Sequence, residues 1–215
     1  MGSTVAVHGR HERTKATDRH SSTMSAPDTP AGYRPPEPFT YPSGFLGVAS
    51  VLALVGSVVG FGAILWVFQG RPEGGSITFG LVELVVAFLT VIGTFVIHEA
   101  IHGVVFRLLG YRVSFGFAAS VPALYTAAFD QFVTRRDNLL TGVAPLVVVT
   151  VVGIPLLAAP IPIALVAYLA LLVNTSGGVG DCYMAWRLWR LPDGTLCYDA
   201  DVRHSYLFRP ANPEP

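Results

Sequence analysis

Long apolar blocks alternate with short polar segments along this chain. The blocks cover residues 45–68, 79–109 and 139–159, and a fourth starts at Ile163. Apolar stretches of about 18 or more residues are typical of membrane-spanning helices, whereas a soluble helix keeps one polar face. We therefore predict an α-helical integral membrane protein with about four transmembrane helices.

The fourth apolar block loses its character at Asn174 and continues as Asn174-Thr-Ser-Gly-Gly-Val-Gly-Asp181. The glycines predict a break in the helix, followed by a new helix that runs to Leu191. Irregular backbone within a membrane is tolerated only where it lines a cavity or packs on protein. This break is therefore a place to look for a site.

A different pattern occupies residues 111–137, where aromatic and β-branched side chains alternate with small ones. Such alternation favours short strands. Between the second and third spans we predict a short interfacial β-hairpin or re-entrant segment, with the hairpin at residues 115–134.

The two ends of the chain are polar. Residues 1–40 are rich in Pro, Ser and Thr and predict a disordered N-terminal tail, because they cannot bury enough apolar surface to offset ordering. Residues 41–195 form the expected membrane-embedded domain, and residues 196–215 a short polar C-terminal tail. Cys182 and Cys197 are not in a Cys-x-x-Cys pair and are expected to be free thiols.

Composition agrees with the membrane class. The chain is 52% hydrophobic and only 13% charged, and its formal net charge of zero gives no indication of nucleic-acid binding. Basic residues in short loops set orientation in a membrane. They gather on one side of the predicted spans, with Arg71 alone on the other, which predicts an integral plasma-membrane protein with both termini in the cytoplasm. The gathered residues are Arg112, Arg135, Arg136, Arg187 and Arg190.

The second span contains the motif His98-Glu99-Ala100-Ile101-His102. Residues four apart share one face of a helix, so both imidazoles can reach one Zn²⁺ ion, with Glu99 beside it as the general base. Three ionisable residues within one span are costly unless a partner compensates them, and a metal ion is such a partner. A hydrogen-bonded polar cluster and a non-catalytic metal site are the alternatives.

A catalytic zinc site needs a third protein ligand. Asp181 is the best placed candidate, since it follows the glycine-rich break at the same depth as the histidines; it could also cap the new helix. The other candidates fall in segments expected to be solvated or interfacial: Asp130, Asp137, Asp193, Asp199, Asp201 and His204.

With this motif, residues 75–195 resemble the site-2-protease-like intramembrane zinc metallopeptidases, and more closely a compact zincin-peptidase domain family. In the larger family an Asn and then an Asp follow in a later span, and the Asp is the third ligand. Asn174 and Asp181 match that order and approximate spacing, although Gly177, Gly178 and Asp181-Cys182 replace the family's prolines and Asp-Gly pair.

This resemblance implies that Asn174 binds the substrate or its oxyanion, unless it only terminates the helix. It also implies that the predicted hairpin docks unfolded substrates by strand addition. We thus predict a zinc-dependent endopeptidase in the lipid bilayer that acts on membrane-anchored protein or peptide substrates. The alternative is a membrane scaffold or metal-binding protein without turnover; only the enzyme needs Glu99.

Overall fold

The computed structural model describes residues 27–70, 80–118 and 123–212. The helices are α1 (Ser43–Gln69), α2 (Leu81–Leu108), α3 (Arg135–Leu156), α4 (Ile161–Gly177) and α5 (Val179–Trp189). The strands are β1 (Glu37–Phe39), β2 (Ser114–Ala118), β3 (Ala123–Ala127), β4 (Phe132–Thr134), β5 (Leu196–Asp199) and β6 (Ser205–Phe208).

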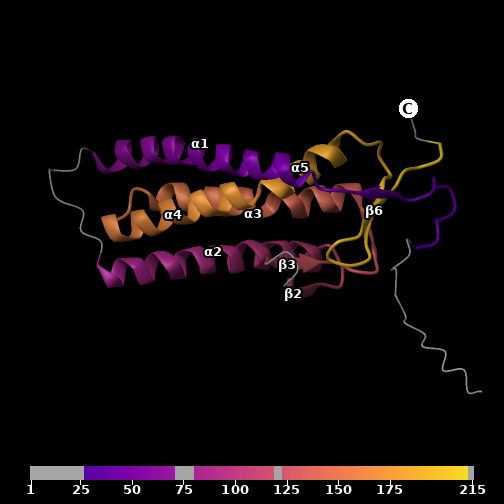
Figure 1. Ribbon diagram of the computed structural model, residues 1–215, viewed down its shortest axis with the longest axis horizontal. Helices are drawn as coiled ribbons and strands as arrows, with labels where there is room; N and C mark the ends of the chain where they lie inside the picture. Colours follow the sequence, from indigo (N-terminus) through magenta and orange to yellow (C-terminus); the bar gives the residue numbers. More distant parts are fainter. Residues whose placement is uncertain (1–26, 71–79, 119–122, 213–215) are drawn as a thin grey trace, which may run out of the picture.

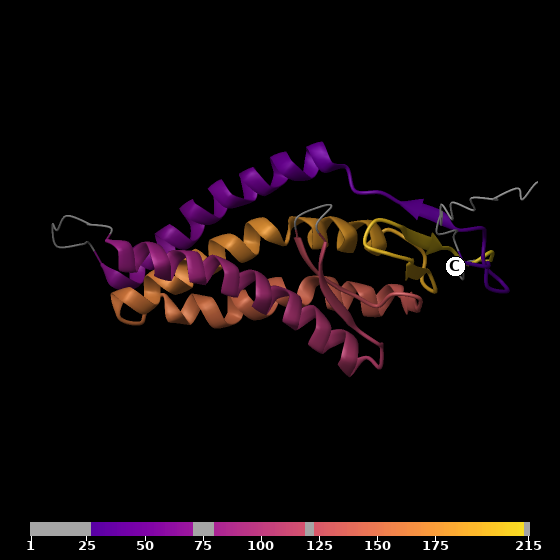
Figure 2. The same ribbon diagram turned by 60° about the horizontal axis from the view of Figure 1, so that its bottom comes forward.

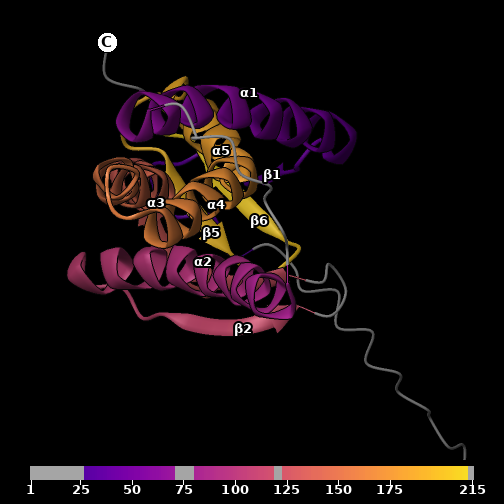
Figure 3. The ribbon, with the colours of Figure 1, turned by 90° about the vertical axis from the view of Figure 1, so that its left-hand side faces the viewer.

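The helices form three tiers, with α3 and α4 in the middle tier between α1 and α2 (Figures 1 and 3). Helix α1 packs on α4 and α5, while α2 packs on α3 and α4. Small side chains let α4 lie between its neighbours, since Ala164 and Ala167 are buried there. The middle tier therefore connects the two outer helices.

Three helices, α1, α2 and α3, are long and apolar enough to cross a membrane. A fourth span results if α4 and α5 count as one, their axes differing by 46°. The outer surfaces of these helices are apolar, as Val59 (68% exposed) and Leu81 (78% exposed) illustrate. The structure confirms the mostly helical class, with three or up to four helices among the described residues that could span a membrane.

The break in the fourth span is shorter than predicted. Helix α4 continues through Asn174 to Gly177, and only Gly178 separates it from α5. The amide N–H of Gly178 still donates to the Asn174 carbonyl at 2.9 Å, which explains why a glycine-rich sequence keeps helical structure here. Gly178 also takes the N-cap position, so the alternative role of Asp181 as that cap does not hold.

Both predicted tails need correction. Residues 37–39, assigned to a disordered tail, form β1, and residues 196–199 and 205–208 of the predicted polar tail form β5 and β6. These strands make one antiparallel sheet in the order β1-β6-β5-β4, at the end of the bundle where Figure 2 shows the yellow strands. Phe39, Cys197 and Leu207 are buried together in its core. Residues 1–26 and 213–215 lie outside the described residues.

The predicted hairpin is present. Strands β2 and β3 pair antiparallel, from Ser114 opposite Ala127 to Ala118 opposite Ala123, and β4 joins the other sheet instead. The hairpin lies close against α2, because a Cβ atom on Gly103 would come within 2.2 Å of the Phe115 ring. The Thr126 hydroxyl donates to the Glu99 carbonyl at 2.8 Å, so β3 is attached to α2 within the metal-binding motif.

Candidate metal centre

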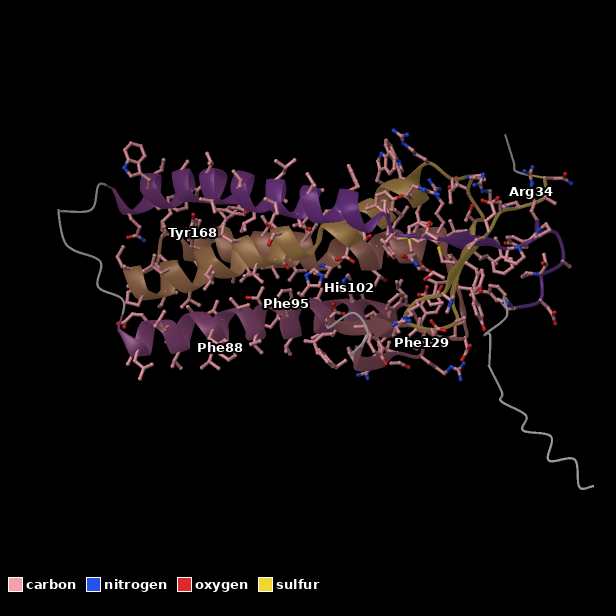
Figure 4. All side chains as sticks on the ribbon, in the orientation of Figure 1. Arg34, Phe88, Phe95, His102, Phe129 and Tyr168 are labelled. Atoms are coloured by element: carbon pink, nitrogen blue, oxygen red, sulfur yellow. The ribbon has the colours of Figure 1, made fainter. Side chains whose placement is uncertain are left out.

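His98 and His102 lie one turn apart on the face of α2 that meets the middle tier, and both are buried. Figure 4 shows His102 pointing from α2 toward α3 and α4, whereas Phe88 points outward. The two Nε2 atoms are 3.2 Å apart. The helical spacing thus brings the two imidazoles to one point.

Asp181 reaches the same point from the first turn of α5. Its Oδ2 atom is 3.0 Å from Nε2 of His98 and 3.5 Å from Nε2 of His102. Only Gly178 separates α4 from α5, and the two axes differ by 46°, so Asp181 lies in the first turn after the bend.

The outer nitrogen of each imidazole has its own acceptor. Nδ1 of His102 is 2.9 Å from the Thr141 carbonyl of α3, and Nδ1 of His98 is 2.9 Å from Oδ1 of Asn174 in α4. A carbonyl oxygen only accepts, so Nδ1 of His102 donates and carries the proton. The Nδ2 amide group of Asn174 donates to the Pro145 carbonyl at 3.4 Å, so Oδ1 of Asn174 is the atom that accepts from His98.

With both protons on Nδ1, three unprotonated acceptor atoms converge: two Nε2 lone pairs and a carboxylate oxygen. Acceptors this close repel one another unless a proton on one of them or a metal ion between them offsets the repulsion. With metal–ligand distances of about 2.1 Å, the edge of a tetrahedral zinc site is about 3.4 Å. The three separations of 3.0, 3.2 and 3.5 Å are close to that edge, so the donor set fits zinc. Outer partners on Nδ1 are also the usual support of zinc-binding histidines.

Glu99 lies beside this cluster. A carboxylate oxygen of Glu99 and one ring nitrogen from each of His98 and His102 lie within 4.8 Å of one another, so these three residues could also hold a metal ion. Oδ2 of Asp181 lies 3.0 and 3.5 Å from the two Nε2 atoms, close to the edge of a tetrahedral site, so Asp181 is a candidate third ligand beside Glu99. With Asp181 as the third ligand, the Glu99 carboxylate would be available for proton transfer.

Two cavities meet at the cluster. One, of about 270 Å³, lies toward the strands, and the other, of about 470 Å³, lies between α2 and α4. Glu99, Leu124 and Asp181 line both. The cluster therefore stands where the two spaces join.

Residues 91–196 match the model of a family described as "Putative zincin peptidase". The matched stretch begins within α2, ends at the start of β5, and includes the histidines, Glu99, Asn174 and Asp181. The description indicates a zinc metallopeptidase, in agreement with the donor set. Neither a curated protein nor a solved structure matches the chain.

Asn174 contacts one of the motif histidines directly. Its side chain is 2% exposed and contacts His98 and the Pro145 carbonyl, so it fixes the orientation of the His98 imidazole. It also lines the larger cavity, and contact with substrate stays a prediction.

The other candidate ligands have partners away from the cluster. Asp137 accepts from the Tyr111 hydroxyl, Asp130 from the Tyr198 hydroxyl, and Asp193 from Arg135. Asp201 binds His204. Asp199 lines the smaller cavity from the end of β5.

Electrostatics differ among the groups outside the helical bundle. Desolvation raises the pKa of Asp199 despite a hydrogen bond from Ser205. Desolvation alone would also raise the pKa of Asp201, but hydrogen bonds from His204 and from backbone N–H groups lower it overall. Burial raises the pKa of Cys197 to about 12, so this free thiol stays protonated.

Sequence reasoning missed the Thr141 carbonyl and the Thr126 hydroxyl. The signal for the Thr141 carbonyl is Pro145, four residues later in the same helix, because proline has no N–H to bind that carbonyl and leaves it available to His102. Thr126 falls within the predicted hairpin, but its partner Glu99 is recognisable only once the hairpin is placed on α2.

Proposed function

We propose that this chain is an intramembrane zinc-dependent endopeptidase that hydrolyses membrane-anchored substrates. The observation that carries the proposal is the convergence of three acceptor atoms, from His98, His102 and Asp181, next to Glu99. These three side chains would hold the ion. When bound, Zn²⁺ supplies Lewis acidity, which lowers the pKa of water and polarises a peptide carbonyl.

Glu99 is the proton-transfer group. It lines both cavities, so its carboxylate can take a proton from the attacking water and hold it for the leaving amine. Thr126 binds the main-chain oxygen of Glu99 and so holds β3 beside this residue. His98 and His102 keep their orientation through the bonds at Nδ1.

The cavities suggest how a membrane-anchored substrate reaches Glu99. The cavity between α2 and α4 has apolar walls, including Ile92, Phe95 and Phe117, suited to a segment that comes from lipid. The cavity toward the strands is lined by polar groups such as Asn138, Asp199 and Ser205. A chain that extends from one to the other passes the cluster.

Strand β3 supplies a docking edge in this proposal. Four consecutive residues of β3, Leu124 to Ala127, line the cavity toward the strands. Side chains alternate between the faces of a strand, so consecutive lining residues mean that the backbone edge faces the cavity. An extended substrate can add to that edge. Addition also keeps the peptide unwound, which exposes its peptide bonds to attack.

We further propose that the protein lies in the plasma membrane, with both termini of the chain and the sheet β1-β6-β5-β4 in the cytoplasm. Strands β1 and β6 come from opposite ends of the described chain and pair with each other, which supports a common side. The positive-inside rule supports the same side, because it predicts a cytoplasmic position for Arg112, Arg135 and Arg190.

The test is Glu99→Gln in purified protein, with a membrane-anchored reporter substrate. Loss of a general base costs about 10²–10⁴-fold in rate, while zinc content stays at the wild-type level. Glu83→Gln is the matched control, because Glu83 lies in the first turn of the same helix and, among the described residues, accepts a hydrogen bond from the Gly80 amide away from the cluster. Both the wild type and this control should cleave.

Two results would count against the proposal. Cleavage by Glu99→Gln at the wild-type rate would exclude the mechanism. A wild type that binds one zinc ion but cleaves no membrane-anchored substrate would favour the scaffold alternative.

A further inference from the structure

A third cavity lies away from the metal centre, between the start of α1 and the outer face of α5. It has a volume of about 800 Å³ and shares no lining residue with the two cavities at the cluster. Its floor is apolar, with Phe45, Leu46, Ala49 and Val179. We call it the α1–α5 groove.

The rim of the α1–α5 groove is basic. Arg187, Arg190 and Arg209 line it, and none of the described lining residues is acidic. Within the described residues, neither Arg187 nor Arg190 has a carboxylate within 4.0 Å. Arg209 pairs with Glu37 at 2.7 Å, and its buried Nε has no hydrogen-bond partner among the described atoms. The groove thus carries an uncompensated positive charge.

Aromatic side chains hold the two free guanidinium groups in place. Arg190 lies 4.3 Å from the centre of the Trp186 ring, and Arg187 donates to the Tyr183 hydroxyl at 3.2 Å. Such contacts fix the arginines without neutralising them. A planar guanidinium held in this way is suited to bind phosphate.

The groove lies at the boundary between the apolar bundle and the polar sheet. Trp186 (44% exposed) and Trp189 (71% exposed) mark this level, because tryptophan concentrates where a membrane meets water. The apolar residues Phe45, Leu46 and Ala49 lie in the first two turns of α1, whereas Arg209 directly follows β6 of the sheet. An occupant must therefore have an apolar part next to an anionic part.

We infer that the α1–α5 groove binds an anionic phospholipid, with its phosphate at Arg187 and Arg190 and an acyl chain on the apolar floor. Basic pockets between membrane helices recognise anionic headgroups in general. The inference rests on the proposed membrane placement but is independent of peptidase activity. Helix α5 carries both sites, since Cys182 lines the groove and its neighbour Asp181 reaches the cluster.

The experiment uses Trp186 as the reporter, in the full chain with Trp66→Phe and Trp189→Phe. The protein is reconstituted in phosphatidylcholine nanodiscs that contain either phosphatidylglycerol or phosphatidylcholine with brominated acyl chains. Each basic residue near an anionic surface strengthens binding about fivefold. Brominated phosphatidylglycerol should therefore quench Trp186 at a mole fraction at least about fivefold lower than brominated phosphatidylcholine does. Arg187→Gln/Arg190→Gln should remove this preference.

The matched control is Arg112→Gln/Arg136→Gln, which removes two exposed basic side chains outside the groove and should keep the preference. If the groove double variant does not fold, Arg190→Gln alone should reduce the preference about fivefold. Equal quenching by both lipids, or equal loss in the control, would overturn the inference. So would complete loss of the preference in millimolar inorganic phosphate, which would indicate a phosphate site rather than a lipid site.

The membrane placement has its own readout. A variant that keeps only Trp66, which is 55% exposed on α1, should be quenched by brominated phosphatidylcholine. Quenching there without any lipid preference at Trp186 would reject the lipid site alone. Absence of quenching at Trp66 would reject the membrane placement itself.

Discussion

The two histidines of the cluster are supported in different ways. His102 donates to a main-chain carbonyl, that of Thr141 in the continuous helix α3. His98 contacts two side chains, Asn174 and Asp181, which stand on either side of the break at Gly178. The α3 half of the site thus depends on backbone, and the α4–α5 half depends on side chains and a bend.

This difference separates the preformed part of the site from the adjustable part. A main-chain acceptor within a helix keeps its position whatever the side chain. The position of Asp181 depends on the angle between α4 and α5, so a change in that angle alters the third ligand first. Substitutions in the α4–α5 half should therefore weaken zinc binding more than substitutions in the α3 half.

The largest effect is expected from Asp181→Asn. It keeps the size of the side chain but removes the charged ligand oxygen, so zinc affinity should fall by more than the roughly 100-fold that loss of an outer partner can cost. Competition with a chromophoric chelator measures this. Asp130→Asn is the control, because Asp130 binds Tyr198 away from the cluster. Equal zinc affinity of both variants would move the third ligand elsewhere.

Asn174→Ala should have the next largest effect. It removes the acceptor for Nδ1–H of His98, so the imidazole loses its orientation, and zinc affinity should fall about 10–100-fold in the same competition assay. Asn174→Asp restores an acceptor oxygen and should recover most of the affinity. If neither variant changes zinc binding, Asn174 does not position His98.

Parts of the site and of the fold could be predicted from the sequence, and other parts could not. The helical spacing of His98 and His102, and the glycine-rich approach to Asp181, were readable as patterns, because each depends on neighbours along the chain. The strands β1, β5 and β6 were not. They have only three or four residues each, and β1 pairs with β6 across most of the chain, so local composition indicated tails.

The bend itself gives a third prediction, from a pair of glycines. A Cβ atom on Gly178 would lie 3.1 Å from the Asn174 carbonyl oxygen and 3.8 Å from Oδ2 of Asp181, whereas one on Gly180 would meet nothing within 4 Å. Gly178→Ala should displace the start of α5 slightly and weaken zinc binding a few-fold, less than Asn174→Ala. Gly180→Ala should leave zinc binding unchanged. Equal chelator competition curves for the two variants would show that the bend tolerates the added methyl group.

The smallest effect is expected from Thr141→Val in the α3 half. His102 uses the carbonyl of Thr141, and the Thr141 hydroxyl is buried without a hydrogen-bond partner among the described atoms. Valine has nearly the same shape, and an unpaired buried hydroxyl costs about 1–3 kcal/mol. Zinc affinity should therefore stay at the wild-type level, and thermal unfolding in detergent should occur at the same or a higher temperature. A loss of zinc affinity as large as that of Asn174→Ala would contradict the assignment of His102 to a main-chain acceptor, and with it the distinction between the two halves of the site.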